Sequence, residues 1–465
     1  MLKDKGFVSA SYDLYGGFSH LLDYGPLGVL LKRNVTRLWW HHFVTLRDDV
    51  FGMDTPILSP EPLWRAAGHL SHFTDPLVQC VSCRHIFRAD HLVESTSTPT
   101  TPSIPSTSST NSAACMSADE LQIALSEHPP RCPHCGKQEW GEVRATNLMF
   151  RTQVGPQQQH SVTGYLRPET AQGLFINYGS VARCMRRAPP FGLAQIGKAF
   201  RNELDPGGFL FRLREFEQME LEYFCHPAAS DACYRQWVDR CHGFLTGVLG
   251  LDASSLRLRE HAPGESAHYA RATTDIEYRY TFGWKELWGV ANRTDYDLRQ
   301  HAAATGAHSS LSCRDPVSGD TFVPHVVEPS VGLDRLVYAL LTDAYRHDDQ
   351  GTGRSVLALR PSLSPYLFAV LPLLKDPRMV ALAARLRADF LLPLSSGRAV
   401  DLDVPGTVGR RYRRQDQIGT PFCAVIDHQS LEDNSFTIRF RDSMQQVRLS
   451  MDPTTIFRFL QEQNV

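Results

Sequence analysis

Residues 190–203 read P-F-G-L-A-Q-I-G-K-A-F-R-N-E, and residues 209–225 read F-L-F-R-L-R-E-F-E-Q-M-E-L-E-Y-F-C. Asp205-Pro206-Gly207-Gly208 stands between them, and this composition is typical of a turn that joins antiparallel strands. We therefore predict two paired strands, around which the rest of the chain is organised.

Side chains alternate between the two faces of a strand, so this pair has a polar face. That face carries Gln195, Gly197, Ala199, Arg201 and Glu203 on the first strand and Arg214, Phe216, Gln218, Glu220 and Glu222 on the second. Guanidinium groups, an aromatic ring and carboxylates suit a ligand with phosphates, a flat ring and an amine. A charged strand that faces water gives the same pattern, so the pattern alone leaves both interpretations open.

Three motifs resemble one family of enzymes. R-P-E-T-A-Q-G at 167–173, F-R-N-E at 200–203 and R-E-F-E-Q-M-E at 214–220 closely resemble glycyl-tRNA synthetases of the homodimeric class II type. The second strand resembles class II motif 2, and the resemblance covers essentially the whole chain. It implies activation of glycine with ATP to glycyl-adenylate, followed by transfer of the glycyl group to the 3′-terminal adenosine of tRNA(Gly).

The same resemblance implies an α+β fold. A class II antiparallel sheet flanked by helices is expected in a catalytic domain at residues 1–355, with a zinc-knuckle insertion at 75–161. A C-terminal α/β anticodon-binding domain is expected at 356–465. Strands that alternate with helices after residue 366 support that last expectation.

The composition is that of an ordinary globular protein. Of 465 residues, 42% are hydrophobic and 21% charged, and the net charge of −2 shows no global basic field, so a tRNA partner requires local patches. We see no signal peptide and no run of apolar residues long enough to span a membrane. Eleven cysteines without a secretory signal favour reduced thiols and a cytoplasmic location.

A helix is predicted after Asp23-Tyr24-Gly25-Pro26, because Leu27, Leu30, Leu31, Val35 and Leu38 follow the helical spacing with proline at the first turn. A strand is expected around residues 51–58. An ordinary core helix fits this pattern as well. The segment resembles motif 1, the dimer interface of class II synthetases, and the resemblance implies a homodimer.

Two C-x-x-C pairs predict a structural zinc site. Cys80 and Cys83 form one pair and Cys132 and Cys135 the other, and together they can complete a tetrahedral shell of thiolates. Redox motifs or unused thiols are the alternatives. The Ser/Thr/Pro-rich tract at 94–112 is typical of a flexible loop between the two knuckles.

The adenylate-forming reaction explains the residues that the resemblance implies for ATP. Charge builds on the α-phosphate as the carboxylate of glycine attacks it, and a fixed guanidinium stabilises that charge. Arg201 and Arg335 match the catalytic arginines, Glu203 and Phe216 match the residues that hold the purine, and Glu286 matches the carboxylate that holds Mg²⁺ on the phosphates. The implied ATP contacts are Arg201, Asn202, Glu203, Phe211, Arg212, Leu213, Arg214, Glu215, Phe216, Glu286, Leu287, Gly332, Leu333, Asp334 and Arg335.

Glycine offers only an ammonium and a carboxylate, so a selective site has to read the ammonium and exclude a Cβ. The resemblance implies substrate contacts at Arg88, Glu169, Phe216, Glu217, Gln218, Met219, Glu220, Arg293, Glu328, Ser330 and Gly332. Glu169 and Glu220 match the carboxylates that face the ammonium, although ordinary buried ion pairs give the same residues. Gly332-Leu333-Asp334-Arg335 resembles motif 3 at the start of a helix, where the helix dipole favours anions.

The segment Gly409-Arg410-Arg411-Tyr412-Arg413-Arg414 forms a local basic patch in the C-terminal region. Phosphate contacts and base stacking suit RNA, although a solvated helix face has the same composition. Two other functions stay open on the residues alone: a non-catalytic binding protein on this fold, and a synthetase for serine, threonine or proline. The catalytic arginines argue against the first, and the glutamate-rich motifs favour glycine over the second.

Overall fold

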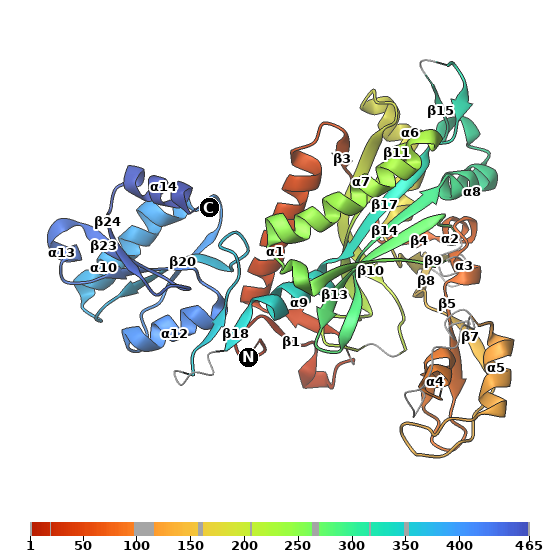
Figure 1. Cartoon of the computed structure of the whole chain (residues 1–465), viewed down its shortest axis with the longest axis horizontal. Helices are drawn as coiled ribbons and strands as arrows, with labels where there is room; N and C mark the ends of the chain where they lie inside the picture. The colour runs from red at the N-terminus through yellow and green to blue at the C-terminus, as the bar shows by residue number, and fades with distance from the viewer. Residues whose placement is uncertain are drawn as a thin grey trace.

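The computed structural model describes residues 2–18, 20–96, 116–156, 161–204, 207–262, 269–315, 318–347 and 353–463. Figure 1 shows a central sheet with its helices, an insertion that extends to the lower right, and a C-terminal domain at the opposite side. Most of the tract at 94–112, together with Asp205 and Pro206, lies outside the described residues. The predicted domain boundary between residues 355 and 356 stays a prediction.

Seven strands form the central sheet in the order β12-β13-β14-β17-β11-β10-β3. Neighbouring strands are antiparallel except β10 and β3, which are parallel. The strands span Leu256–Glu260 (β12), Ala272–Tyr280 (β13), Gly283–Thr294 (β14), His325–Gly332 (β17), Glu215–Cys225 (β11), Phe191–Phe200 (β10) and Val50–Gly52 (β3). The predicted pair of strands, β11 and β10, is the third and second strand from the β3 edge of this sheet.

The two faces of the sheet are covered differently (Figure 1). One face packs Met219, Leu221 and Tyr223 of β11 against a large core built with helices α1 (Pro26–Trp40), α7 (Ser230–Gly243) and α9 (Leu333–Ala344). The other face is covered only toward the end of β11, where Phe224 packs with α6 (Ala171–Cys184) and α8 (Tyr296–Thr305). Residues 216–220 on that second face are therefore free to line a cavity.

Helix α1 forms as the sequence predicts. Pro26 occupies its first turn, and Leu27, Leu31, Val35 and Trp39 are buried at intervals of four residues. This apolar stripe packs within its own chain against the sheet and α9.

Two local predictions differ from the structure. The strand expected at 51–58 is split into β3 and β4 (Leu58–Pro60), because Pro56 in the connection lacks an N–H for a ladder. The ladder between β10 and β11 ends at the Phe200–Glu215 pair, so Arg201 and Glu203 lie in the connection and not in a strand. One further hydrogen bond, from the Arg201 N–H to the Arg214 carbonyl (2.9 Å), keeps the connection close to the sheet.

The insertion has its own small core of Val78, Ala89, Leu92, Leu121, Leu125 and Val143. Its strands are β5 (Thr74–Gln79), β6 (Ile86–Arg88) and β7 (Arg144–Asn147), with helices α4 (Ala89–Thr96) and α5 (Ala118–Glu127). A second small sheet, β4-β9-β8, adds β8 (Arg151–Val154) and β9 (Val162–Leu166), and the short helices α2 (Glu61–Ala66) and α3 (His69–His72) precede the insertion.

The C-terminal domain has a five-stranded sheet in the order β21-β20-β22-β23-β24. Its elements are β20 (Tyr366–Pro372), α10 (Pro377–Arg385), α11 (Leu392–Leu394), β21 (Ala399–Leu402), α12 (Val408–Ile418), β22 (Phe422–Ile426), α13 (Ser430–Asp433), β23 (Ser435–Phe440), β24 (Gln446–Ser450) and α14 (Pro453–Glu462). The predicted strands at 367–371 and 422–426 are confirmed.

Three further hairpins are short: β1 (Val8–Ala10) with β2 (Leu22–Tyr24), β15 (Cys313–Arg314) with β16 (Thr321–Phe322), and β18 (Tyr345–His347) with β19 (Ser355–Leu357). Within the described residues, every helix is too short or too polar to cross a lipid bilayer.

Candidate active site

A cavity of about 320 Å³ opens on the polar face of the central strands. Of the predicted residues, it is lined by Glu169, Arg201, Glu203, Phe211, Arg212, Leu213, Phe216, Gln218, Glu220, Glu286, Glu328, Ser330, Gly332, Asp334 and Arg335. The two predicted catalytic arginines and the two predicted ammonium-facing glutamates thus meet in one cavity, although they come from separate parts of the chain.

Acidic and amide groups gather toward the C-terminal end of β11. Glu220 accepts hydrogen bonds from the backbone N–H (3.0 Å) and the hydroxyl of Thr170, which stands just before α6. The Gln218 amide lies 3.4 Å from Glu220 Oε1 and 3.3 Å from Ser330 Oγ across the strand pair. The register Glu220–Ser330 and Gln218–Gly332 fixes these neighbours, so the sheet itself positions this end of the cavity.

Glu169 faces the same end of the cavity and is held in its ionised form. His69 Nε2 lies 3.2 Å from Glu169 Oε2, and the Gln172 amide donates to Glu169 Oε1 at 3.0 Å. Burial alone would raise the pKa of Glu169, but His69 and then Arg293 outweigh it and hold that pKa well below its usual value. A fixed negative charge at this position suits a substrate ammonium.

Arg293 does not line the cavity as the resemblance implies for a substrate contact. Its guanidinium is 1% exposed, forms two hydrogen bonds with Asp297 (2.7 and 2.9 Å) and donates to Glu328 Oε2 at 2.5 Å. Tyr269 covers it, with the ring centroid 3.7 Å away. Arg293 therefore lies behind the wall, where it holds Glu328 in place.

Arg201 stands between two aromatic rings at the other end of the cavity. Its guanidinium carbon lies 5.3 Å from the ring centroids of both Phe73 and Phe216, and its Nε donates to the Pro168 carbonyl at 3.1 Å. The carbonyl of Pro168 immediately precedes Glu169, so one short segment positions both the cationic and the anionic groups of the cavity.

Arg335 lies in the first turn of α9, and its side chain contacts Glu286 of β14 and Phe211 of the connection before β11. It forms an ion pair with Glu286 (2.9 Å), donates to the Phe211 carbonyl (2.9 Å) and lies 4.4 Å above the Phe211 ring. Burial would raise the pKa of Glu286, but the Arg335 guanidinium holds it below its usual value. Both groups are therefore charged and face the cavity.

The connection between β10 and β11 supplies further charges. Glu203 Oε2 lies 4.0 Å from Arg212 Nε, and the Arg214 guanidinium donates to the Glu203 carbonyl at 3.0 Å. Asn202 is tied to the insertion through its backbone N–H, which donates to the Leu148 carbonyl at 2.7 Å. Arg88 is outside the cavity wall, where it pairs with Asp75 (3.0 Å) and Asp90 (2.6 Å).

Several residues of the matched motifs face away from the cavity. Glu217 pairs with Lys32 at 2.7 Å, Glu215 pairs with Lys198 at 2.8 Å, and Met219 is fully buried in the core. Leu287 and Leu333 belong to the same core. Strand alternation is the physical reason, because odd-numbered positions of β11 point toward α1 and α9.

Two residues behind the cavity wall support it: His69 contacts Glu169, and the Phe73 ring lies beside Arg201. Both come from the segment before the insertion, and neither belongs to a motif. His261 and Asp275 line the cavity together, with His261 Nε2 2.8 Å from Asp275 Oδ2, and neither residue belongs to a motif. Only the tertiary structure brings these residues together, and no spacing in the sequence signals them.

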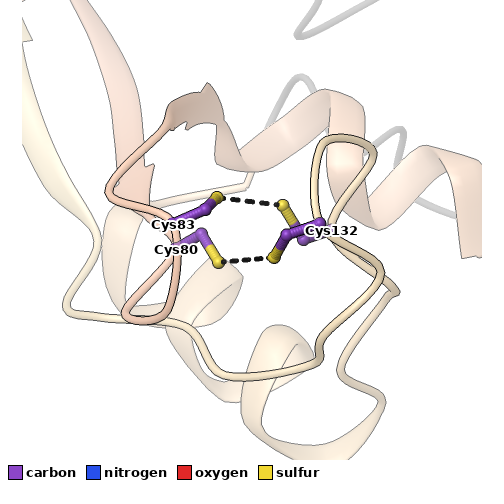
Figure 2. Close-up of side chains that lie close together, drawn as sticks. Cys80, Cys83 and Cys132 are labelled. Atoms are coloured by element: carbon purple, nitrogen blue, oxygen red, sulfur yellow. Dashed lines mark hydrogen bonds between the residues drawn. The ribbon is translucent and has the colours of Figure 1, made fainter.

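The four cysteines of the insertion lie within 4.8 Å of one another, sulfur to sulfur. Two of the sulfur–sulfur contacts, Cys80 to Cys135 and Cys83 to Cys132, are 3.7 Å each, and dashed lines mark them in Figure 2. A tetrahedron with Zn–S bonds of about 2.3 Å has sulfurs about 3.8 Å apart, so the set fits Zn²⁺ with no open position. His85 and His134 stack beside it, with centroids 3.6 Å apart.

Curated relatives match almost the full length of the chain. The glycine–tRNA ligase of Caldanaerobacter subterraneus subsp. tengcongensis is 43% identical over 463 residues, which cover 99% of this chain and 96% of that protein. The glycine–tRNA ligase of Clostridium acetobutylicum is 45% identical, with coverage of 97% and 95%. The chain belongs to the glycine–tRNA ligase family.

Membership of the glycine–tRNA ligase family confirms the predicted family and enzyme class. A solved prolyl-tRNA synthetase from Cryptosporidium parvum, complexed with L-proline and AMP, aligns with a TM-score of 0.63 at 11% identity and covers 100% of this chain and 74% of that one. At that identity the likeness concerns the fold alone, and it confirms the class II sheet.

The family model described as "Anticodon binding domain" matches residues 368–457. Within this part of the ligase-family chain, the basic segment of α12 is not one continuous surface. Arg411 is 1% exposed and donates to the carbonyls of Pro372, Leu373 and Asp403, and Arg414 pairs with Asp403. Arg410 and Arg413 are exposed, so they are the arginines of this segment that an RNA can reach.

Proposed function

We propose that the cavity is the site where this member of the glycine–tRNA ligase family activates glycine with ATP and passes the glycyl group to tRNA(Gly). One observation supports this assignment most strongly. Two ionised or donor-bound glutamates, Glu169 and Glu220, share a cavity with two arginines, Arg201 and Arg335. The first pair suits an ammonium and the second suits a polyphosphate.

The glycine ammonium is expected between Glu169 and Glu220, with Gln218 and Ser330 as further hydrogen-bonding groups. Each carboxylate already has a fixed orientation, because Thr170 holds one and His69 with Gln172 holds the other. Preorganised charge of this kind costs no reorganisation when the substrate binds.

Adenylate formation follows from the placement of the arginines. A carboxylate oxygen of glycine forms a bond to the α-phosphorus of ATP, the bond to the bridging oxygen breaks, and pyrophosphate leaves. Arg201 stabilises the negative charge that develops on the α-phosphate, while Arg335 holds the outer phosphates. Phe216, whose ring now lies against Arg201, is the surface on which the purine stacks.

The nucleotide enters as its magnesium complex. Glu286, which pairs with Arg335 at 2.9 Å, would hold the metal, because its charged carboxylate is the hard oxygen ligand that Mg²⁺ prefers. In the second step a ribose hydroxyl of the terminal adenosine attacks the acyl carbon, and AMP leaves. No side-chain nucleophile is required for either step.

The remaining parts of the chain serve this reaction. Cys80, Cys83, Cys132 and Cys135 hold a structural zinc ion that stabilises the insertion, and the C-terminal domain contacts tRNA through Arg410 and Arg413. We further propose a homodimer that works in the cytoplasm. Apolar side chains of the first hairpin support the dimer, because Tyr12, Leu14, Tyr15 and Phe18 are 65–97% exposed.

The decisive experiment is ATP–pyrophosphate exchange measured with each of the twenty amino acids. Exchange is expected with glycine alone. Arg201→Ala or Arg335→Ala should lower it by at least about a hundredfold, the cost of one lost charge-stabilising group, with unchanged thermal unfolding. Arg378→Ala, an exposed arginine of the C-terminal domain, is the control. Strong exchange with proline or serine, or near-normal exchange in either cavity variant, would refute the assignment.

A further inference from the structure

Glu222 lies beneath the cavity and has no evident partner. It is two residues beyond Glu220 on β11, points to the same face of the strand and is 0% exposed. Within the described residues, neither of its carboxyl oxygens has a hydrogen-bond partner. A buried carboxyl group without a donor is costly if it is ionised, so its presence requires an explanation.

The sheet places Glu222 directly among other acidic groups. The register of β11 with β17 pairs Glu220 with Ser330 and Tyr223 with Val327, so Glu222 faces Glu328 across the strands. Carboxyl oxygens of Glu220, Glu222 and Glu328 lie within 4.8 Å of one another. Its neighbour on β10 is the apolar Leu193.

Two further charged groups act on Glu222 from the neighbouring elements. Arg293 of β14 opposes the rise in the pKa of Glu222, and Asp297 of α8 accepts two of the guanidinium hydrogen bonds of that arginine. The remaining contact of Arg293 goes to Glu328. One guanidinium therefore donates to two carboxylates, and none of these three hydrogen bonds goes to Glu222.

The hydrogen-bond partners decide which of the three glutamates carries a proton. Glu220 accepts two hydrogen bonds from Thr170, and Glu328 accepts one from Arg293. Burial raises the pKa of Glu328 as well, but the Arg293 guanidinium opposes that rise. Glu222 lacks a donor. Burial first, and then Glu328 and Glu220, raise the pKa of Glu222 well above its usual value, in agreement with this geometry.

We propose that Glu222 is a positioning residue that stays a neutral carboxylic acid and donates its O–H to its cross-strand neighbour Glu328. This inference rests on the proposed function of the cavity. The donated hydrogen bond and Arg293 together fix Glu328, so Glu169 and Glu220 are left to bind one ammonium. An ionised Glu222 would add a third uncompensated charge next to that pair and would favour other cations over glycine.

The test compares two variants of similar size. Glu222→Gln keeps an N–H donor for Glu328, whereas Glu222→Leu removes the donor. We expect the KM for glycine to be about tenfold or more higher in Glu222→Leu than in Glu222→Gln, with the KM for ATP equal in both. Equal KM values for glycine in the two variants would overturn the proposal.

An infrared spectrum gives a readout that does not depend on activity and that a purely structural role would not change. The carbonyl band of a protonated carboxyl group is expected in the unsubstituted chain at neutral pH and should be lost in Glu222→Gln. It should persist in Glu277→Gln, a buried sheet glutamate that pairs with Arg257. A band that is absent from the start, or unchanged in Glu222→Gln, rejects the proton on Glu222.

These outcomes are separable from a failure of the proposed function. If the unsubstituted chain showed no glycine-dependent exchange, the function would be rejected while the infrared band still reported on Glu222. If Glu222→Leu failed to fold, two measurements on Glu222→Gln would still test the proton on Glu222. They are the infrared carbonyl band and the pH dependence of the free energy of unfolding. The raised pKa of Glu222 makes the folded protein lose stability as pH rises above the unfolded pKa of glutamate, about 4.3. Glutamine does not titrate, so the stability of Glu222→Gln relative to the unsubstituted chain should increase above that pH.

Discussion

The charge of Glu169 depends on residues that are far away in the sequence. His69 comes from α3, before the insertion, and Gln172 comes from α6, yet both contact this one carboxylate. The depressed pKa of Glu169 is therefore a product of tertiary structure. It keeps the carboxylate ionised near neutral pH, where glycine carries an ammonium.

Replacement of His69 tests this arrangement. His69→Ala removes the largest influence that keeps Glu169 ionised, so its pKa should rise and the acid limb of kcat/KM for glycine should move to higher pH. We expect the KM for glycine to rise about tenfold to a hundredfold, as for one lost hydrogen bond to a charged group. The pH profile of pyrophosphate exchange measures both effects.

The same substitution has a defined effect on stability. A depressed carboxyl pKa stabilises the folded state above the unfolded pKa, about 4.3, and that contribution is lost as pH falls. His69→Ala should therefore lower thermal stability near neutral pH more than in acid. His72→Ala, on the exposed side of the same short helix, is the control, and an unmoved acid limb in His69→Ala would contradict the role.

Among individual residues, the sequence motifs predict part of the candidate active site. Arg201, Phe216, Glu220 and Arg335 were predicted from matched stretches, and the structure brings them into one cavity. His69 could not be predicted, because no residue pattern around it differs from that of an ordinary short helix. Strand alternation already indicated that odd-numbered residues such as Glu217 face away from the ligand side, although the motif match included them.

At the scale of elements, α12 shows how one basic segment serves two purposes. Arg411 binds three carbonyls at the ends of β20 and β21, whereas Arg410 beside it is exposed. Arg411→Ala leaves those carbonyls without a donor and should lower the free energy of unfolding by about 2–4 kcal/mol. Calorimetry of the full chain measures this loss.

Arg410→Ala and Arg413→Ala change the two exposed arginines of the same helix, and they test contact with RNA where Arg411→Ala tests stability. Each should raise the KM for tRNA severalfold and weaken its salt dependence, because each removes one phosphate contact, with no change in unfolding. Unchanged aminoacylation in the double variant would show that tRNA contacts another surface of the domain.

The insertion is the second element that a substitution can test. We expect about one zinc ion per chain, retained in the presence of a chelator, because four thiolates close the coordination shell. Cys135→Ser should lose the metal and loosen the insertion, and Cys184→Ser, an exposed cysteine of α6, should keep it. Elemental analysis and protease sensitivity of the insertion measure the two effects. Freshly purified protein without zinc would remove the assignment.

Prediction of elements succeeded where hydrophobic spacing was long and regular, as in α1 and β20. It failed at residues 51–58, where Pro56 interrupts an otherwise strand-like composition and the two halves pair with different sheets. The sequence also predicted that the strand continues past Phe200 to Glu203. Arg201 and Glu203 keep the two-residue spacing of the polar face, although the hydrogen-bonded ladder with β11 ends at Phe200. In both cases the strand boundaries depend on which other strands the segment pairs with, and the sequence of one segment does not contain that information.

At the scale of the whole molecule, the insertion and the catalytic sheet meet beside the nucleotide end of the cavity. The Leu148 carbonyl binds the N–H of Asn202, and Asp75 with Arg88 lies close enough to Glu203 for their charges to interact. The zinc knuckle is thereby connected to the cavity through a few contacts. Loss of the metal should consequently lower the kcat of adenylate formation as well as the stability of the insertion.

The first hairpin is the remaining large feature without a partner in the described chain. The apolar stripe of α1, which the motif resemblance linked to dimerisation, is buried within its own subunit. Leu14 and Tyr15, in contrast, are 97% and 91% exposed, and Phe18 beside them is 72% exposed. Large exposed apolar side chains of this kind mark interaction sites, so the first hairpin is the contact that we propose for the dimer.

Leu14→Asp combined with Tyr15→Asp should dissociate the dimer. Two charges in a buried apolar contact are unfavourable by several kcal/mol, which is enough to shift a micromolar sample from dimer to monomer in sedimentation analysis. Phe457→Asp, which changes a half-exposed aromatic residue of α14, should leave the dimer intact and is the matched control. Sedimentation of the unsubstituted chain as a stable, active monomer at micromolar concentration would contradict the dimer itself. A dimer that survives the double substitution would instead place the contact on another surface.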